Sequence, residues 1–216
     1  MTANTGRITS IVQDNKNRYR YHIYVDDQYA FEVHEDILVK YALHKGKELD
    51  SYQLAELLAE EERNKAYLHA LRYLGIRPRT AAQLESYLKD KGYPEELAAQ
   101  TRQRCQQQGY IDDKAFASQW VWERIVSKSR SLMALRMELR QKGVAEEDIQ
   151  DATSQVKQSD QLEAAVRLLA KKVRNRTSPL DFEERQKLSA MLLRKGFALE
   201  IIRQAIQTVQ NGDTEC

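Results

Sequence analysis

Long apolar runs are missing from this chain, since no stretch of 18 apolar residues occurs, and we expect no transmembrane helix. Proline and glycine are scarce, with three and eight among 216 residues, while 31% of the side chains are charged. That composition is typical of a helical, soluble protein. The opening MTANTGRITSIVQD lacks the charged start and apolar core of a secretory signal. The sequence therefore predicts a cytoplasmic protein.

Residues that commonly build catalytic or metal sites are equally sparse. Cys105 and Cys216 are the only two cysteines, without metal-ligand spacing, which favours a reduced compartment. No serine–histidine–aspartate set, phosphate-binding glycine loop or HExxH motif occurs. We therefore expect that the protein is not an enzyme and that it binds neither a metal nor a cofactor. The four histidines, none of them spaced as ligands, are His22, His34, His44 and His69.

One helical phrase occurs three times. Residues 84–92 read LESYLKDKG, residues 135–143 read LRMELRQKG and residues 188–196 read LSAMLLRKG. The paired leucines make an apolar stripe, the lysine suits the negative end of the helix dipole, and glycine suits the left-handed C′ position. A spacing near 50 residues predicts a mainly α fold, a tandem array of three three-helix repeats forming an elongated curved molecule. The three repeat glycines are Gly92, Gly143 and Gly196.

The first 33 residues differ from the rest and predict a small β-containing segment. RITSIVQ, RYRYHIYV and QYAFEV alternate apolar and polar residues, and Asp26-Asp27 is a plausible two-residue hairpin loop, so we expect three strands. EDILVKYALHKG follows as a short helix closing near Gly46. Asp50 and Gln53 form a capping box for a long helix that runs to about Leu74.

The repeat phase divides the chain into five segments. Thr80 and Ser131 are predicted to cap the second helices of the first two repeats. The segments are 1–50 with the strands and short helix, 51–108 with a linker helix and the first repeat, 109–158 with the second repeat, 159–210 with the third, and 211–216 as a disordered tail.

The net charge of +2 hides a polarised distribution. Residues 1–63 hold 8 basic and 12 acidic side chains, whereas residues 64–142 hold 15 basic and 8 acidic ones. A basic stripe attracts nucleic acid or an acidic protein surface, although charge runs on helices are often simply solvated.

Two cationic stripes lie beside predicted leucine stripes. Arg136 and Arg140 are four residues apart, and we expect them to share an exposed helix edge. Arg167, Lys171 and Arg174 repeat the pattern in the third repeat, where no acid interrupts residues 164–180. The candidate partner- or DNA-binding residues are Arg77, Arg79, Arg130, Arg136, Arg140, Arg167, Lys171, Lys172, Arg174 and Arg176.

The motif GYIDD at residues 109–113 contains a carboxylate pair that resembles a catalytic pair. Because Asp112 and Asp113 stand just before a helix, helix capping is the better explanation. Gly109 then ends the preceding helix, and Tyr110 and Ile111 are predicted to pack between repeats.

Trp120 and Trp122 share the helix that follows this motif. Trp120 falls near the core side of that helix, and we expect Trp122 to be buried between repeats. The alternative is an exposed aromatic that stacks on a base or anchors a protein partner.

The GYIDD motif, its continuation Lys-Ala-Phe-Ala, the Arg-Pro-Arg-Thr turn at residues 77–80 and the three repeated phrases together resemble the RecX family of recombinase regulators. The resemblance covers about residues 60–209, and the β-rich N-terminal extension is similar to that of longer Gram-positive members. Two departures stand out. Val144 replaces the aromatic present as Tyr93 and Phe197, and the third repeat lacks an Arg-Pro turn before its second helix.

This resemblance implies a non-enzymatic monomer that lies along the groove of RecA–DNA filaments and restrains filament growth, ATP turnover or strand exchange in DNA repair. It also implies that the chain could contact single- or double-stranded DNA. A stand-alone DNA-binding regulator built from helix-turn-helix-like units is the main alternative, and a plain helical scaffold is the second.

Overall fold

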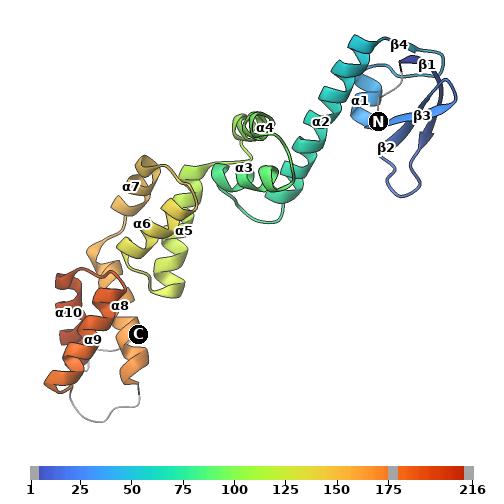
Figure 1. Cartoon of the computed structure of the whole chain (residues 1–216). Coiled ribbons are helices and arrows are strands. Elements are labelled where there is room, and N and C mark those ends of the chain that lie inside the picture. The colour runs from blue at the N-terminus through green and yellow to red at the C-terminus, as the bar shows by residue number, and fades with distance from the viewer. Residues whose placement is uncertain (1–4, 175–179, 212–216) are drawn as a thin grey trace. The chain divides into compact units, whose positions relative to one another are not determined.

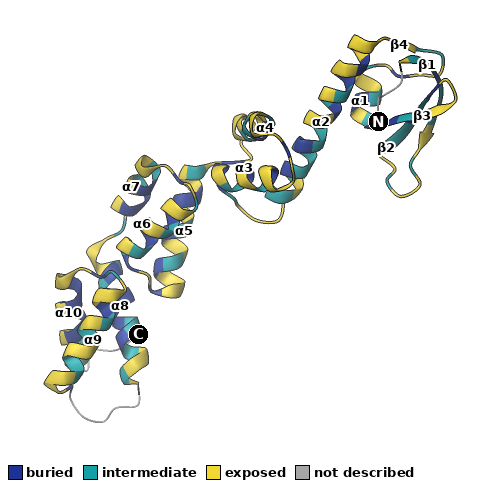
Figure 2. Ribbon diagram, in the orientation of Figure 1, coloured by how far each residue is buried: buried dark blue, intermediate teal, exposed yellow. Residues whose placement is uncertain are grey.

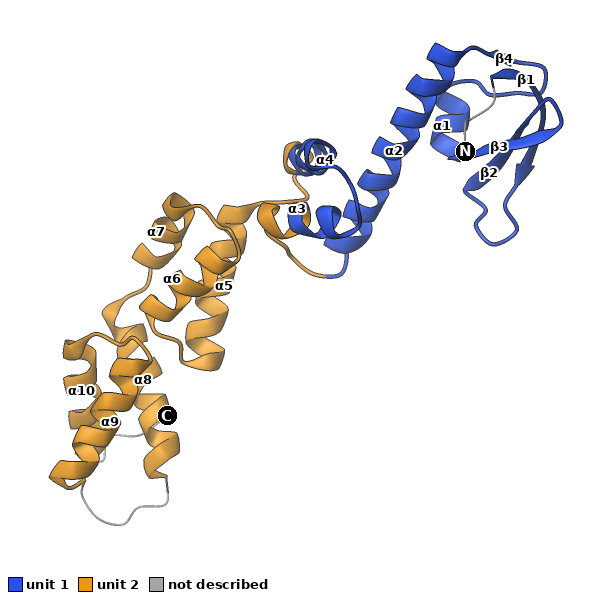
Figure 3. Cartoon of the chain, in the orientation of Figure 1, with its two compact units in different colours: residues 1–76, 85–105 blue, residues 77–84, 106–216 orange. Residues whose placement is uncertain are grey.

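The computed structural model describes residues 5–174 and 180–211. These residues form ten helices and four strands, so the fold is mainly α with a small N-terminal sheet, as the sequence predicts (Figure 1). The chain divides into two compact units (Figure 3). Unit 1 comprises residues 1–76 and 85–105, and unit 2 comprises residues 77–84 and 106–216. The predicted tail, from residue 212 onward, and Arg176 lie outside the described residues.

An antiparallel sheet with the strand order β3-β2-β1-β4 forms the start of unit 1. Asp26 and Asp27 both have positive φ angles, 48° and 62°, as a type I′ hairpin turn requires, which confirms the predicted turn. The three predicted strands are confirmed, but the prediction missed a fourth strand, which has only two residues, too few for an alternating pattern. The strands are β1 (Gly6–Gln13), β2 (Arg20–Val25), β3 (Gln28–His34) and β4 (Glu48–Leu49).

Two helices follow the sheet. Helix α1 (Glu35–Lys40) stops six residues before Gly46, earlier than predicted. Gly46 instead serves the sheet: its φ is +92° and its N–H donates to the carbonyl of Ile8 over 2.8 Å. Helix α2 (Ser51–Leu74) begins with the predicted capping box, in which the Gln53 N–H donates to Asp50 Oδ1 over 2.7 Å.

The sheet and α2 share a core that contains one buried ion pair. Glu61 on α2 is only 2% exposed; it accepts from the Arg20 guanidinium and from the His34 N–H, the latter over 2.8 Å. Because a buried carboxylate is costly unless paired, the bonds of Glu61 to Arg20 on β2 and to His34 on β3 fix where α2 meets these two strands. The apolar members of the core are Ile8, Ile23, Val25, Phe31, Val33, Ile37, Leu43, Leu49, Leu54 and Leu57.

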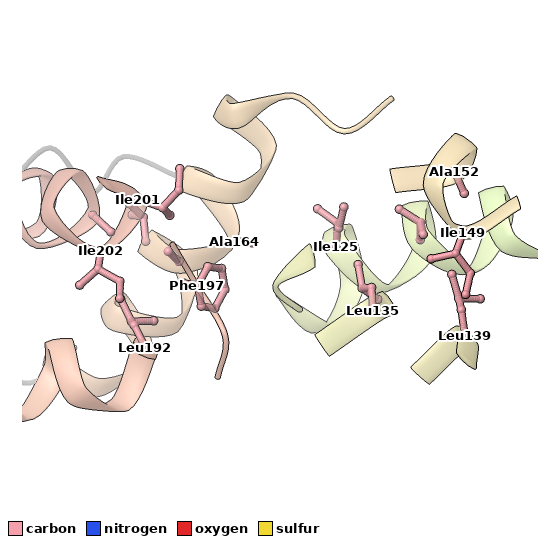
Figure 4. Close-up of a cluster of buried hydrophobic side chains, with 14 of the residues drawn as sticks. Ile125, Leu135, Leu139, Ile149, Ala152, Ala164, Leu192, Phe197, Ile201 and Ile202 are labelled. Carbon is pink, nitrogen blue, oxygen red and sulfur yellow. The ribbon is translucent and has the colours of Figure 1, made fainter. Parts of the chain in front are cut away.

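The remaining eight helices, together with the C-terminal part of α2, form the three predicted repeats, with three helices in each. In unit 2 most of the buried apolar residues, which are among those dark blue in Figure 2, join into one cluster, and Figure 4 shows two groups of its side chains. The helices are α3 (Ala81–Asp90), α4 (Glu95–Gln107), α5 (Asp113–Lys128), α6 (Leu132–Gln141), α7 (Glu146–Ser154), α8 (Gln158–Val173), α9 (Phe182–Arg194) and α10 (Leu199–Gln210).

Each repeated phrase ends its helix in the same way. The repeat glycine has a φ of +91°, +76° or +83° along the chain, which confirms the predicted left-handed position. The residue after it donates its N–H back to the second leucine of the phrase over 3.1–3.2 Å, which is the Schellman arrangement. That following residue is buried in every copy, so Val144 keeps the core role of the aromatics. The bonded pairs are Tyr93–Leu88, Val144–Leu139 and Phe197–Leu192.

Candidate partner-binding surface

The start of α3 is tied to the end of α6 by one side chain. Thr80 is fully buried and caps α3, accepting the N–H of Gln83 over 3.2 Å. The Thr80 hydroxyl itself donates a hydrogen bond to the carbonyl of Lys142 over 2.6 Å. One hydroxyl thus satisfies an orphan donor of one helix and an orphan acceptor of another.

The start of α6 is tied to the end of α9 by the same device. Ser131 is 1% exposed, accepts the N–H of Ala134 over 3.2 Å and donates to the carbonyl of Lys195 over 2.6 Å. We name these two contacts the first and second joints. The first joint comprises Thr80, Ala81, Ala82, Asp113, Lys142 and Gly143. The second comprises Ser131, Leu132, Met133, Gln161, Lys195 and Gly196.

Each joint has a second hydrogen bond, donated by the backbone N–H of the residue that directly follows the capping Thr or Ser. Ala81 donates to Asp113 Oδ1 over 2.9 Å, and Leu132 donates to Gln161 Oε1 over 2.9 Å. Asp112 caps α5 by accepting the N–H of Ala115 over 2.8 Å. Both aspartates of the GYIDD motif therefore accept backbone N–H groups, which confirms their structural interpretation.

The repeat glycine completes each joint. A Cβ on Gly143 would lie 2.3 Å from the Cβ of Ala82, and one on Gly196 would lie 3.0 Å from the Cβ of Met133. A Cβ on Gly92 would meet nothing within 4 Å. Glycine is therefore required at the joints for close packing as well as for its positive φ.

Beside the first joint, cations surround one aromatic ring. Trp120 on α5 stacks against Phe116, with ring centroids 5.6 Å apart, and its indole N–H donates to Glu138 over 3.0 Å. The Arg124 guanidinium carbon lies 4.0 Å from the ring centroid, and the Lys142 ammonium lies 4.2 Å from it. Both distances are within the range of favourable cation–π contact.

Two more cations face the same lysine. Burial, followed by the charges of Arg77 and Arg124, lowers the pKa of Lys142 below its ordinary value, and Arg79 adds to the effect while Glu138 opposes it. A hollow of about 230 Å³ opens here, with a lining that includes Arg77, Phe116, Trp120, Glu123 and Arg124. We name Arg77, Arg79, Arg124 and Lys142 the tryptophan-centred cation cluster.

Family profiles match the chain in four consecutive stretches. They are described as the regulatory protein RecX N-terminal domain, residues 6–50, and the first, second and third RecX three-helix domains, residues 66–105, 112–152 and 159–206. The chain is 34% identical to the regulatory protein RecX of Bacillus licheniformis over 200 residues, which is 93% of this chain and 76% of that protein. The chain belongs to the RecX family.

Other RecX proteins and structures agree. The regulatory protein RecX of Bacillus subtilis is 32% identical over 96% of this chain and 79% of its own length. A crystal structure of regulatory protein RecX, 34% identical, superposes with a TM-score of 0.74 over 91% of this chain and 97% of that one. The structure of RecX from Lactobacillus salivarius, 26% identical, gives 0.63 over 69% and 97%.

The predicted stripe on α6 is not a free edge in this RecX-family chain. Arg136 is half-buried and donates to the Thr153 hydroxyl over 3.1 Å. Arg140 makes a two-pronged ion pair with Glu146 at 2.7 and 2.8 Å, which raises the pKa of the arginine and lowers that of the glutamate. Arg130 pairs with Glu138 at 3.2 Å. Arg140 is exposed as expected, but Arg136 is half-buried, and both side chains are engaged by residues of α7, so they do not form a free edge.

The stripe on α8 divides in two. Arg167 donates to the carbonyl of Ile125 over 3.0 Å, so it ties α8 to α5. Lys171, Lys172 and Arg174 are exposed, and none of them makes an ion pair with another residue in the described part of the chain. These three remain candidates for binding a partner.

Two aromatic predictions were wrong. Trp122 is 63% exposed and Tyr110 is 53% exposed, whereas both were expected to pack between repeats. Ile111 is buried as predicted, and Gly109, with a φ of +75°, ends α4 as predicted.

Sequence reasoning also missed Arg124, although its spacing of four from Trp120 on a helix was a usable signal. Lys142 was read only as a helix-end cation. Its contact with Trp120 depends on how the end of α6 packs against α5, which the spacing of residues along one helix does not reveal.

Neither a metal site nor a membrane span emerges within the described ranges. Among residues 5–174 and 180–211, no three His, Cys, Asp or Glu side chains are grouped so that they could hold a metal ion. Over the same residues, no helix combines the length and apolar character that crossing a membrane demands.

Proposed function

We propose that this RecX-family chain regulates the recombinase RecA by binding RecA–DNA filaments and slowing their ATP turnover, growth and strand exchange. The observation that carries the proposal is the match to four consecutive RecX domains between residue 6 and residue 206. The name of these relatives describes regulatory proteins, and a regulator acts through a binding surface rather than a catalytic pocket.

The charges of unit 2 support a filament as the partner. Lys171, Lys172 and Arg174 are unneutralised within the described residues, and the tryptophan-centred cation cluster holds four more positive side chains. A nucleoprotein filament presents phosphates and acidic side chains in repeating order, and such a ligand is attracted by cations displayed on successive repeats.

The experiment measures ATP hydrolysis by RecA on single-stranded DNA while the chain is added well below equimolar amounts. Slowing at these ratios supports filament binding, because each bound molecule then affects many RecA subunits. Slowing only when the chain covers the DNA indicates competition for DNA. Sequence-specific binding to duplex DNA without RecA would favour the stand-alone DNA-binding alternative.

A surface variant locates the contact. Lys171, Lys172 and Arg174 changed together to Glu should weaken filament binding by more than about tenfold, because three attractive contacts become repulsive. The matched control changes the exposed cations Lys16, Lys45 and Arg72 of unit 1 to Glu, with the same change in net charge. Equal losses in both variants would show that only overall charge matters.

The corresponding reversal of Arg130, Arg136 and Arg140 is a poorer test. Those side chains hold Glu138, Thr153 and Glu146, so their reversal breaks local pairs and is expected to lower stability as well as binding.

A further inference from the structure

Three members of the tryptophan-centred cation cluster, Arg77, Arg124 and Lys142, bring positive charges together around Trp120 and its hollow. Glu138 is already engaged, because one of its oxygens accepts the Trp120 N–H and the other pairs with Arg130 at 3.2 Å. Glu123 also lines the hollow. Arg124 Nε is buried and lacks a hydrogen-bond partner among the described residues. Like charges held together beside an apolar ring repel one another, and an anion would relieve that repulsion.

The geometry also limits what kind of ligand fits. Trp120 is contacted by Phe116, Arg124 and Lys142 and donates its N–H to Glu138, so little of its ring remains for a base to stack on. What the hollow offers instead is guanidinium and ammonium donors. Guanidinium forks match the oxygens of a phosphate, and an ammonium adds a point charge.

We propose that the hollow between Arg77, Trp120 and Arg124, with Lys142 at its side, is a binding site for a phosphate group. Arg77 is exposed, while Arg124 and Lys142 are half-buried. A ligand with several anionic oxygens can therefore contact the exposed Arg77 and the half-buried Arg124 and Lys142 at the same time. These three cations also exceed the charge of one carboxylate, which favours consecutive phosphates of a nucleic acid strand over a side chain of an acidic protein.

This site goes beyond the proposed function, since a regulator could act on a filament through protein contacts alone. The test therefore uses the full chain without RecA. A fluorescein-labelled oligothymidine is titrated with the wild-type chain and with the double variant Lys142→Met, Arg124→Gln, and anisotropy gives the affinity. Methionine keeps the apolar stem of residue 142 against the Trp120 ring.

The second joint supplies the matched control. Lys195 occupies the place of Lys142 in the next repeat, and its carbonyl makes the same 2.6 Å bond, but its side chain is exposed. The control variant Lys195→Met, Arg203→Gln also removes one lysine charge and one arginine charge from unit 2. We expect the affinity of the cluster variant to fall by at least about tenfold and that of the control by less than about twofold. The salt dependence of the cluster variant should become shallower, by roughly 0.7 in slope for each phosphate that it no longer binds.

Competitors separate the possible sources of phosphate. Displacement of the oligonucleotide by another DNA strand but not by inorganic pyrophosphate assigns the site to a nucleic acid backbone. Displacement by pyrophosphate at similar concentrations assigns it to free phosphate compounds. Polyglutamate competing as well as DNA would overturn the phosphate assignment in favour of an acidic protein. Equal affinities of wild type, cluster variant and control would overturn the site itself, while leaving regulation of RecA to be judged by its own assay.

Discussion

At the first joint Thr80 donates to the carbonyl of Lys142, at the second Ser131 donates to the carbonyl of Lys195, and both distances are 2.6 Å. The helix-start N–H finds a side-chain acceptor at 2.9 Å in both places. The surroundings then diverge. Lys142 is half-buried beside Trp120 and three arginines, whereas Lys195 is exposed. The hydrogen bonds to the backbone are thus the same at both joints of unit 2, whereas the side chains around the two lysines differ.

The difference separates structure from function within one array. A feature present at both joints, such as the capping hydroxyl or the glycine, is sufficiently explained by packing of one repeat on the next. A feature present at only one, such as the tryptophan-centred cation cluster, is not needed for the joint to form. The cluster is therefore the better place to look for binding.

Glycine substitution should break the joints unequally, and this is the largest effect that we expect. Replacing Gly143 by Ala should lower the free energy of unfolding of unit 2 by about 3 kcal/mol, since the new Cβ meets Ala82 at 2.3 Å and φ is positive. Gly196→Ala should cost about 2 kcal/mol because its contact with Met133 is looser at 3.0 Å. Urea unfolding followed by tryptophan fluorescence measures this, because Trp120 and Trp122, the only two tryptophans, lie on α5 in unit 2.

Gly92→Ala is the control for backbone strain alone. No atom lies within 4 Å of its added Cβ, so only the positive φ matters, at about 1 kcal/mol. Because Gly92 belongs to unit 1, circular dichroism is the appropriate probe for that variant. Equal losses for all three glycines would show that close packing at the joints contributes nothing.

Loss of the hydroxyl should cost about the same at both joints. Thr80→Val and Ser131→Ala each leave a helix-start N–H and a lysine carbonyl without their partner, and we expect each to lower the free energy of unfolding by about 2 kcal/mol. Thr80→Ser keeps the hydroxyl and should be close to wild type. A cost at only one position would mean that the two joints are not energetically equivalent.

The local devices of this fold could be predicted from sequence because each depends on residues a few positions apart. Examples are the Asp26-Asp27 hairpin, the Asp50–Gln53 capping box and the C′ glycines. The joints could not be predicted, because the partners are far apart in sequence: Thr80 and Lys142 are separated by 62 residues, and nothing local to Thr80 shows that its hydroxyl has a second partner. Helical periodicity likewise placed Trp120 near the core but gave no information on what covers Trp122.

The candidate site was recovered only in part for the same reason. Arg77 was selected through a family-like turn, whereas Arg124 and Lys142 emerge as partners only when the end of α6 packs against Trp120. Conversely, the α6 arginines were selected by spacing alone, and the acceptors that engage two of them, Glu146 and Thr153, lie on the next helix.

The smallest effect concerns Lys142 itself and has the opposite sign to the others. Replacing Lys142 by Met should raise the melting temperature of unit 2 at pH 7 by about 1–2 °C, because a half-buried ammonium facing Arg77, Arg79 and Arg124 opposes folding, an effect that solvent screening keeps small. Glu138 acts on this lysine in the opposite sense and reduces the cost without removing it. Lys195→Met at the second joint should leave the melting temperature unchanged, since that side chain is exposed.

The pH dependence of stability identifies the cause of the difference in melting temperature between Lys142→Met and wild type. The pKa of Lys142 is lowered in the folded state from an ordinary value of 10.5, so at neutral pH the lysine is charged in both states and folding bears the full cost. As pH rises from the lowered pKa to 10.5, the unfolded state binds more protons and wild-type stability rises relative to the variant. The gap between Lys142→Met and wild type should therefore narrow over this window, and tyrosines that titrate there cancel in the difference. A variant that melts below wild type at pH 7 would show that the cation–π contact with Trp120 outweighs the repulsion, and that the ammonium stabilises the first joint rather than opposing it.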